Sequence, residues 1–329
     1  MHELVREWST RSHPFPFLMR LPLDGGALVA AFAPEGQGSR MQWLAKSARG
    51  EAACRRLRAE RDALLRLAPL AERLCIPRLL DYRESDGGGA PEACLLQTAL
   101  SGLPMRCRWR GHGSWRVWRG LAAADAWLIE FQQQCRLQPD MQTTSCLADL
   151  AEQTRQRLQA AATPAADLLS PLLEQCHPPP ASRCIPIHGD FWAGNLIWRR
   201  GGGQRSTATA RLGVVDWSGL GFGSALDDLL TWMASLPCAA TADARLALWR
   251  HLWFAPGRGR DRLRARARAA GYTPPEARAA FYLFLARRLG WEMGLDLQAR
   301  NQAERKRSLA EWSVALDWLR RQGFPDPFC

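Results

Sequence analysis

The sequence predicts an α+β protein with two lobes: a small N-terminal lobe built on an antiparallel sheet, and a larger, mainly helical C-terminal lobe. Short apolar runs near the N-terminus are separated by glycine-containing turns at 24–26 and 35–39, which is typical of antiparallel strands. Most segments after residue 120 instead carry apolar residues at helical spacing. A chain of 329 residues is long enough for two domains. We place the N-terminal lobe at 1–100 and the C-terminal lobe at 101–329.

The N-terminal lobe is expected to contain five strands and one helix. The segment 51–67 has helical composition, and Leu57, Leu64 and Leu67 supply a buried stripe along it. A fourth and a fifth strand are expected to follow this helix. The five strands are expected at 15–21, 27–32, 41–46, 76–82 and 93–98.

A polar segment between apolar runs is the most informative part of the chain. Residues 188–195, His-Gly-Asp-Phe-Trp-Ala-Gly-Asn, follow the apolar run 184–187, which is expected to form a short buried strand. The apolar runs 196–198 and 212–215 indicate two further strands, joined by a polar, glycine-rich connection. Asp216 comes directly after the second of these strands.

These residue types at this spacing suit phosphoryl transfer. The reaction needs a carboxylate to orient and deprotonate an attacking hydroxyl group, and oxygen ligands to hold magnesium against nucleotide phosphates. Asp190 and Asn195 are five residues apart, which is the spacing of the base and the metal ligand in the catalytic loop of kinases. Asp216 is expected to be the second, stronger magnesium ligand. The alternative is a buried histidine with aspartates that cap turns.

The whole constellation resembles the aminoglycoside phosphotransferase and choline kinase-like family, relatives of the protein kinases. The family's catalytic segment has the form H-G-D-x-x-x-x-N, and an apolar strand ending in D-W or D-F follows; residues 188–195 and Asp216-Trp217 match both parts. An acidic residue that opens a helix about a dozen positions later is also typical, and Asp227-Asp228 fits this feature. The resemblance implies a two-lobed protein kinase-like fold, in which Asp190 is the catalytic base and His188 braces the loop.

Lys46 is one of only two lysines in this arginine-rich chain. It stands at the end of the third expected strand, where the resemblance implies a lysine that contacts the nucleotide phosphates. An ammonium group is a compact point charge that suits this role. A glutamate on the following helix normally positions such a lysine; Glu60 is the first choice and Glu51 the second. The alternatives are a solvent-facing lysine and a surface ion pair.

The expected nucleotide loop is atypical, because the N-terminal lobe contains no G-x-G-x-x-G. Gly25 and Gly26 lie between the first two strands, where the resemblance places this loop, and their backbone N–H groups could approach phosphate oxygens. A simple hairpin turn would have the same sequence. Backbone groups near Gln97 to Ala99, at the end of the fifth strand, are expected to hydrogen-bond the purine edge.

The C-terminal lobe is expected to be helical around the catalytic loop. Fifteen tryptophans are many for this length, and those near the loop could stack on a sugar ring, cage a quaternary amine or pack in the core. Trp192 lies within the loop and is therefore expected to line the site. Helices are expected at 121–134, 148–162, 165–176, 241–254, 258–270, 275–298 and 302–321.

Composition indicates an ordinary globular protein, with 47% apolar and 23% charged residues. The chain has no apolar run of about 18 residues, so we expect no transmembrane segment. The N-terminus lacks the apolar region of a secretory signal. Ten cysteines are scattered without a C-x-x-C pair, and we expect them to be reduced thiols in a cytoplasmic protein.

Basic residues exceed acidic ones by 44 to 32, which gives a net charge of +12. Six arginines alternate between Arg258 and Arg268 and would wrap around a helix, which suits a solvated helix or an anion-binding surface better than a core element. Binding of nucleic acid through this helix is an alternative function, although we expect no nucleic-acid partner. We favour a genome rich in G and C, together with solvated helix faces, over a binding function as the explanation of the arginine content.

The sequence therefore predicts a kinase that transfers the γ-phosphoryl group of ATP or GTP, with Mg²⁺, to a hydroxyl of a small metabolite, sugar, amino alcohol or antibiotic. The basic segment argues against a polycationic acceptor, and the absence of an A-P-E segment after Asp216 gives no support to protein phosphorylation. The alternative is a kinase-like protein that binds nucleotide or a partner without catalysis. Nothing in the sequence indicates an oligomeric state.

Overall fold

The protein is represented by a computed structural model, in which the chain divides into two compact units. The first unit comprises Met1–Asp140 and Ala193–Leu220, and the second comprises Met141–Trp192 and Gly221–Cys329. The structure describes residues 17–23, 27–32, 42–85, 90–105, 114–143, 145–161, 164–174, 176, 184–199, 212–236, 241–292 and 302–329.

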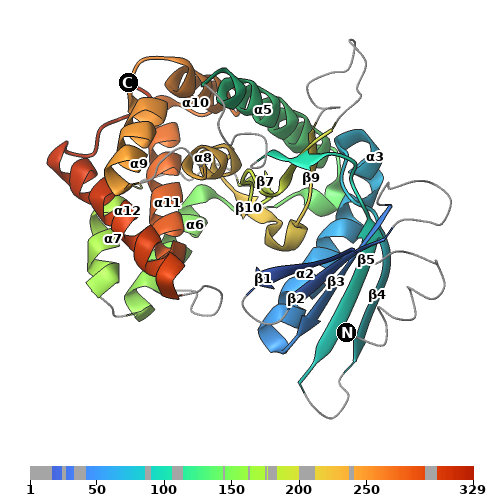
Figure 1. The fold of residues 1–329 in the computed structure, drawn as a ribbon. Helices are drawn as coiled ribbons and strands as arrows, with labels where there is room; N and C mark the ends of the chain where they lie inside the picture. The colour runs from blue at the N-terminus through green and yellow to red at the C-terminus, as the bar shows by residue number, and fades with distance from the viewer. Residues whose placement is uncertain are drawn as a thin grey trace. The chain divides into compact units, whose positions relative to one another are not determined.

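The first unit is built on a five-stranded antiparallel sheet with the strand order β1-β2-β3-β5-β4 (Figure 1). The central strand β3 continues three residues beyond the predicted end at Lys46, so this lysine lies in mid-strand, opposite Val29 on one side and Leu95 on the other. Two neighbouring strands therefore fix the backbone of Lys46 by hydrogen bonding. The strands are β1 (Phe17–Leu23), β2 (Ala27–Phe32), β3 (Trp43–Arg49), β4 (Leu79–Ser85) and β5 (Glu92–Thr98).

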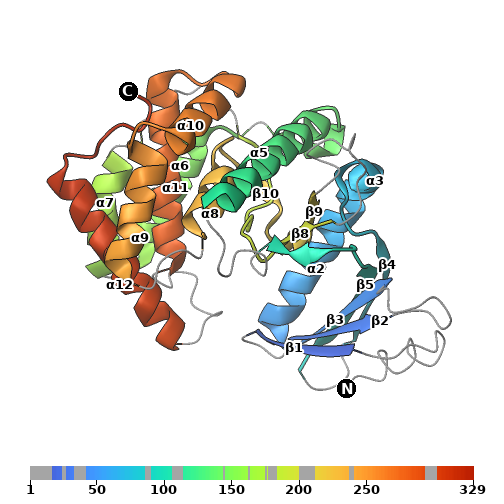
Figure 2. The ribbon, with the colours of Figure 1, turned by 45° about the horizontal axis from the view of Figure 1, so that its top comes forward.

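Helix α2 (Glu51–Leu67) packs against strands β3, β4 and β5 of this sheet (Figure 2). Its bounds match the predicted segment, and Leu57, Leu64 and Leu67 are buried as the helical spacing predicts. Glu60 lies on the same buried face of the helix and is only 2% exposed. A carboxylate among apolar residues is costly unless it is paired, so the position of Glu60 requires a partner.

The remainder of the first unit forms a three-stranded sheet with the order β6-β8-β9, together with helical segments. Gly102 precedes β6 with a φ of 148°, and a Cβ at this position would lie 2.4 Å from the carbonyl oxygen of Trp198, so only glycine fits. Helix α5 is longer than the predicted 121–134. The elements are η1 (Ala68–Leu70), α3 (Ala71–Leu74), β6 (Leu103–Pro104), α5 (Ser114–Arg136), β8 (Leu196–Trp198), β9 (Leu212–Val214) and η4 (Trp217–Gly219).

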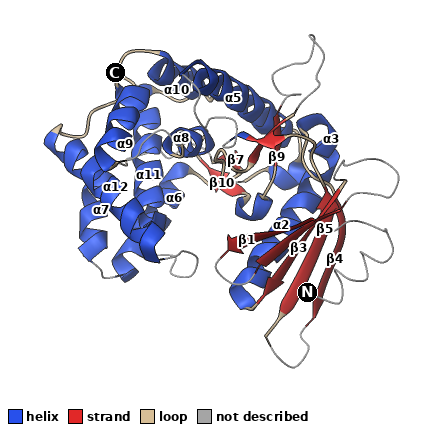
Figure 3. Ribbon diagram, viewed as in Figure 1, coloured by secondary structure: helices blue, strands red, loops and turns tan. Residues whose placement is uncertain are grey.

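The second unit is mainly helical, with one short antiparallel strand pair, β7 and β10 (Figure 3). The helices predicted after residue 147 agree with those observed within a few residues, except that 250–254 forms a π-helix. The end of the helix predicted at 275–298 lies outside the described residues, which stop at 292. The elements of the second unit are α6 (Leu147–Ala161), α7 (Pro164–Glu174), β7 (Ile185–Ile187), β10 (Gly221–Gly223), α8 (Asp227–Ala234), α9 (Ala242–Trp249), η5 (Arg250–Phe254), α10 (Arg258–Ala269), α11 (Pro274–Glu292) and α12 (Gln302–Arg321); η2 (Pro139–Met141) precedes them.

The arginine-rich helix α10 is not a purely solvated element, which corrects the expectation from its sequence. Arg266 is 4% exposed, and its Nε donates a hydrogen bond to the carbonyl oxygen of Ala225 at 3.2 Å. Arg260 and Arg264 also donate to backbone carbonyl oxygens, those of Phe254 and Cys329. Arginine can enter a core when its donors find acceptors, so alternation along the sequence did not exclude a buried face.

The sheet and the helical remainder confirm the predicted α+β class. Among the described residues, no helix is long and apolar enough to cross a membrane.

Candidate active site

Lys46, Glu60 and Asp216 meet in the first unit. The Lys46 ammonium donates to both carboxylate oxygens of Glu60, at 2.6 and 2.7 Å, and lies 3.6 Å from Oδ1 of Asp216. Glu60 is almost completely buried and Lys46 is 15% exposed, whereas Asp216 is 36% exposed. One cation therefore stands between a buried carboxylate that fixes it and a second carboxylate that solvent or a ligand can reach.

The charges of these three groups depend on one another. Burial acts to lower the pKa of Lys46, but attraction by Asp216 and Glu60 outweighs it, and the pKa lies above its ordinary value. Burial raises the pKa of Glu60, against the attraction of Lys46. Lys46 therefore stays protonated at neutral pH, as a phosphate-binding group must.

The strand pair β8 and β9 places Asn195 beside Asp216. Leu196 pairs with Val214, and the Val215 N–H donates to the carbonyl oxygen of Asn195 at 3.0 Å. Of the two predicted metal ligands, Asn195 directly precedes β8, and Asp216 lies two residues after the end of β9. Asp216 adopts the left-handed conformation, with φ 64° and ψ 72°, which is uncommon for a residue other than glycine.

Trp217 anchors the chain directly behind Asp216. Its side chain is completely buried, and its indole N–H donates to the carbonyl oxygen of Val214 at 3.1 Å. The ring packs against Phe131 and Trp127 of α5, with centroid distances of 5.5 and 6.1 Å. Such close aromatic contacts limit rotation of the 3-10 turn η4 and so support the strained backbone of Asp216.

His188, Gly189 and Asp190 lie in the second unit, directly after β7. The carboxylate of Asp228 accepts hydrogen bonds from the backbone N–H of His188 at 2.7 Å and of Gly189 at 3.0 Å. The Asp190 N–H donates to Nδ1 of His188 at 3.2 Å, and the His188 ring is fully buried. A buried ring with Nδ1 engaged fits the bracing role expected of His188 better than that of a base.

Asp228 is a candidate functional residue that we did not assign from the sequence. The sequence signal was the Asp227-Asp228 pair at the start of α8, which we interpreted only as an acidic residue that opens a helix. The structure shows that Asp228 accepts hydrogen bonds from two successive N–H groups of the loop. Burial raises the pKa of this carboxyl to about 7, although those two N–H groups favour the charged form.

We expect catalytic activity and stability to change in opposite directions with pH because of Asp228. Its pKa of about 7 exceeds the ordinary 3.8, so its contribution to stability is complete below pH 3.8 and is lost as pH rises through about 7. As pH rises through about 7, Asp228 becomes the charged carboxylate, which is the stronger acceptor for the N–H groups of His188 and Gly189. The catalytic loop should then be held more firmly, so turnover should rise over this pH range. Turnover and melting temperature measured from about pH 5 to 9 test this expectation.

Asp228→Asn supplies the control for this pH dependence. The amide keeps one acceptor oxygen, so one loop N–H loses its partner, and turnover should fall on the order of tenfold. The fall in stability near pH 7 should disappear in this variant, because no proton is exchanged. A melting temperature that still falls between pH 6 and 8 by as much as in the wild type would contradict the role of Asp228.

At the end of β5, where backbone groups were expected to bind the purine, two N–H groups bond to other parts of the protein. The Ala99 N–H donates to the carbonyl oxygen of Gln42 at 2.7 Å, and the Thr98 N–H to that of Arg78 at 2.9 Å. Two backbone N–H groups of the stretch 97–99, which was expected near the purine, are thus engaged within the protein. The Gln97 side chain is 1% exposed and its Oε1 has no protein partner; by strand register it shares the sheet face of Lys46.

Of the other predicted site residues, Gly25 and Gly26 lie outside the described residues. Glu51, the second choice for the partner of Lys46, instead pairs with Arg58 at 3.2 Å on the exposed side of α2. The structure therefore brings Lys46, Glu60 and Asp216 into direct contact in the first unit. His188 and Asp190 belong to the second.

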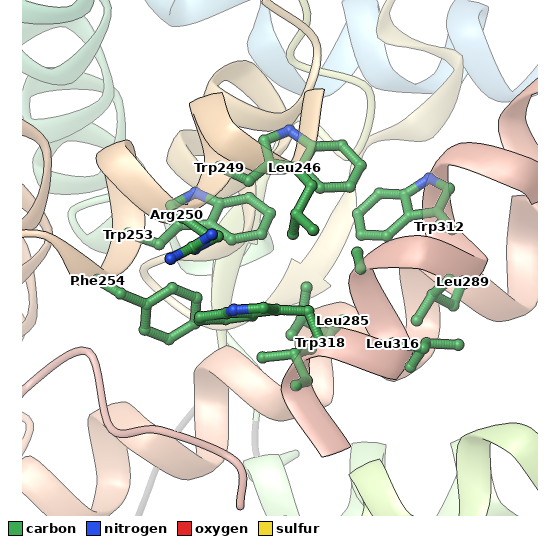
Figure 4. Close-up of a pocket in the computed structure, with 12 residues that line it drawn as sticks. Leu246, Trp249, Arg250, Trp253, Phe254, Leu285, Leu289, Trp312, Leu316 and Trp318 are labelled. Carbon is green, nitrogen blue, oxygen red and sulfur yellow. The ribbon is translucent and has the colours of Figure 1, made fainter. Parts of the chain in front are cut away.

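The tryptophans of the described residues pack mainly in the core. Trp127, Trp217 and Trp232 are fully buried, while Trp192 in the loop is half-buried. In the second unit, the ring of Trp249 lies 4.2 Å from that of Trp312. These two rings line an apolar pocket whose single charged lining residue is Arg250 (Figure 4). Close packing explains these rings without a ligand.

Comparison with known proteins places the fold among the kinases. The chain belongs to the phosphotransferase enzyme family (APH), which matches residues 21–266. Choline kinase from Cryptosporidium parvum Iowa II has the same fold, with a TM-score of 0.58 at 9% identity, covering 98% of this chain and 98% of that chain. A Ralstonia eutropha JMP134 protein, provisionally assigned as an aminoglycoside phosphotransferase, gives 0.56 at 12% identity, covering 97% and 98%.

These comparisons confirm the predicted family and the two-lobed, protein kinase-like α+β fold. The chain is accordingly assigned to a phosphotransferase family, as predicted. No match is found among curated proteins.

Proposed function

We propose that this protein is a small-molecule kinase that transfers the γ-phosphoryl group of ATP, or of GTP, to a hydroxyl group with the help of Mg²⁺. The observation that carries the proposal is the Lys46–Glu60 ion pair with Asp216 beside the same ammonium. A buried ion pair contributes little net stability. Its presence next to an accessible carboxylate in a strained backbone is better explained by phosphate and metal binding.

The residues present suit magnesium. Mg²⁺ prefers hard oxygen ligands and usually takes one or two from the protein, with water and substrate phosphates as the others. Asp216 offers a carboxylate and Asn195 an amide oxygen. The pairing of β8 with β9 brings their backbones close together, because the Val215 N–H donates to the carbonyl oxygen of Asn195. Among the described residues, no group of three or more His, Cys, Asp or Glu side chains is arranged to hold a metal ion. A magnesium ion does not require such a group when nucleotide phosphates and water supply most of its ligands.

Each residue has a defined task in the proposed reaction. Lys46, held by Glu60, contacts the nucleotide phosphates, and Asn195 with Asp216 would hold the metal. Bound magnesium would neutralise charge on the phosphate oxygens. Asp190 accepts a hydrogen bond from the acceptor hydroxyl, orients it and takes its proton. Residues 1–100 would serve as the nucleotide lobe, while 101–329 would carry the catalytic loop and the acceptor site.

The acceptor is proposed as a small metabolite, sugar, amino alcohol or antibiotic. Two proteins that share the fold are named for choline and for aminoglycosides, which agrees with small hydroxylated acceptors. The argument against a polycationic acceptor weakens, because Arg260, Arg264 and Arg266 of α10 are bonded within the protein. A cytoplasmic location is part of the proposal, since the eight cysteines of the described residues are free thiols.

Calorimetric titration with a non-hydrolysable ATP analogue, and then its GTP counterpart, tests the proposal directly. We expect binding that requires magnesium, followed by release of ADP when a panel of hydroxylated amines and sugars is added to ATP. The inactive control is Asp190→Asn. Failure to bind either analogue in the presence of magnesium would reject the nucleotide site, and with it the proposed function.

The Lys46–Glu60 pair can be tested for activity and stability separately. Lys46→Met should weaken nucleotide binding and lower the unfolding free energy by about 3 kcal/mol, because it leaves Glu60 buried and unpaired. In the double variant Lys46→Met/Glu60→Gln most of this stability should return, because no unpaired charge remains. Activity should stay low in both. Recovery of turnover in the double variant would show that the pair is structural only.

A further inference from the structure

We propose that Arg287 of α11 is a positioning residue for phosphoryl transfer, which acts through Asp227 on the turn that holds the catalytic loop. The inference deepens the proposed function and rests on it. Asp227 and Asp228 open α8, and Asp228 accepts the N–H groups of His188 and Gly189. Whatever fixes the start of α8 therefore also fixes the backbone that carries Asp190.

The contacts of Asp227 join three separate elements. Its Oδ2 accepts a hydrogen bond from Nη1 of Arg287 at 2.6 Å, and its Oδ1 accepts one from the hydroxyl of Ser224 at 2.5 Å. Asp227 is 7% exposed and Arg287 is 32% exposed. Sixty residues separate the two partners in the chain, so the pair ties α11 to the turn between β10 and α8.

Gly223 shows that this pair is packed directly against the strand next to the loop. A Cβ at Gly223 would lie 2.4 Å from Oδ2 of Asp227 and 3.3 Å from Nη1 of Arg287. Gly223 belongs to β10, which pairs with β7, and His188 follows β7 directly. The carboxylate of Asp227 thus fills the space that a side chain at Gly223 would occupy. The Asp227–Arg287 pair, the start of α8 and the β7–β10 strand pair therefore form one rigid group.

The turn is held from a second side as well. Arg266 of α10 donates to the carbonyl oxygen of Ala225, and the Tyr272 hydroxyl accepts the Ala225 N–H at 3.1 Å. These contacts fix the backbone at Ala225, whereas Arg287 fixes the side chain of Asp227.

Arg287 also supplies a positive charge that offsets the negative charge of Asp227, the residue next to Asp228. The charged side chains that act on Asp228 are Asp227 and Arg266, beside the N–H groups of His188 and Gly189. Asp227 in turn faces Arg287, Tyr272 and Cys184.

Arg287→Met tests this role with two readouts. Amide hydrogen exchange of the peptide that contains His188 and Gly189 should become about tenfold faster, because the acceptor Asp228 is no longer fixed. Turnover should fall on the order of tenfold with nucleotide affinity unchanged, because the predicted nucleotide ligands belong to the first unit. Arg287→Lys should restore part of the turnover. Asp227→Asn, which preserves the volume, is measured in the same way should Arg287→Met fold poorly.

A pH profile separates positioning from a purely structural role. Without Arg287, the charge of Asp227 should keep Asp228 protonated to higher pH, so the acid limb of turnover should move to higher pH. The double variant Arg287→Met/Asp227→Asn should move it back. The matched control is Arg278→Met, on the same helix, where Arg278 donates to the carbonyl oxygen of Phe324; it should leave the acid limb unchanged.

Several outcomes would overturn the inference. Unchanged exchange of the His188 and Gly189 amides in both Arg287→Met and Asp227→Asn would reject it. Equal acceleration of exchange throughout the second unit would also reject it, since Arg287 would then act on stability alone. If wild-type protein transfers no phosphoryl group to any acceptor, the proposed function fails, while the exchange measurement still decides whether Arg287 holds the loop.

Discussion

Asp190→Asn should lower turnover by about a thousandfold while nucleotide binding and folding remain nearly unchanged. The amide has the size of the carboxylate but cannot take the proton of the acceptor hydroxyl. Asp190 contacts the loop through its backbone, because its N–H donates to Nδ1 of His188, and this contact survives the substitution. Steady-state turnover, calorimetry with the ATP analogue and thermal unfolding measure the three quantities.

The control for this prediction is Asp243→Asn, in the first turn of α9 of the same unit. This variant removes the same charge and should retain turnover. Retained turnover in Asp190→Asn would refute its assignment as the base. Loss of nucleotide affinity together with turnover would instead give Asp190 a binding role, contrary to the mechanism proposed above.

Local patterns in the sequence were sufficient to predict much of the first unit. The bounds of α2 followed from helical composition and spacing. Glu60, the first choice for the partner of Lys46, lies three residues from Leu57 and four from Leu64, on the same buried face. A glutamate on a buried stripe must find a cation, and Lys46 was the compact cation in the neighbouring strand. Strands β8 and β9 matched because their short apolar runs are bounded by polar turns.

Long-range contacts were the part that sequence could not predict. The Gly-Phe-Gly of β10 has no strand pattern, so its pairing with β7 gave no local signal. Arg287 and Asp227 are far apart in the chain, and helical spacing does not show which arginine finds a carboxylate. Arg266 was interpreted as part of a solvated helix, because the alternation of arginines within 258–268 does not reveal which distant residues pack against the helix. The structure shows that Ala225 is one of them. The bond from the Ala99 N–H to Gln42 depends on a similar long-range approach.

Asp216→Asn should weaken magnesium-dependent nucleotide binding by more than about tenfold and lower turnover by about a thousandfold. Asparagine is the informative replacement because Asp216 has a φ of 64°, and asparagine tolerates the left-handed region better than alanine does. The amide can still accept the Ser218 hydroxyl, which lies 3.3 Å from Oδ1. Lys46 keeps its bonds to Glu60. The loss should therefore reflect the missing carboxylate charge.

Asp216→Gly separates the cost of the backbone from the function of the side chain. Glycine adopts positive φ without strain, so the variant should be more stable than Asp216→Ala by about 1 kcal/mol. It should nevertheless bind magnesium-nucleotide as poorly as Asp216→Asn. A glycine variant that is folded, stable and inactive would show that the strained aspartate is retained for its oxygen atoms. The assignment of Asp216 as a metal ligand would be refuted if Asp216→Asn and wild type bound the ATP analogue equally well in the presence of magnesium. The remaining role of Asp216 would then be to position Lys46 for the nucleotide phosphates.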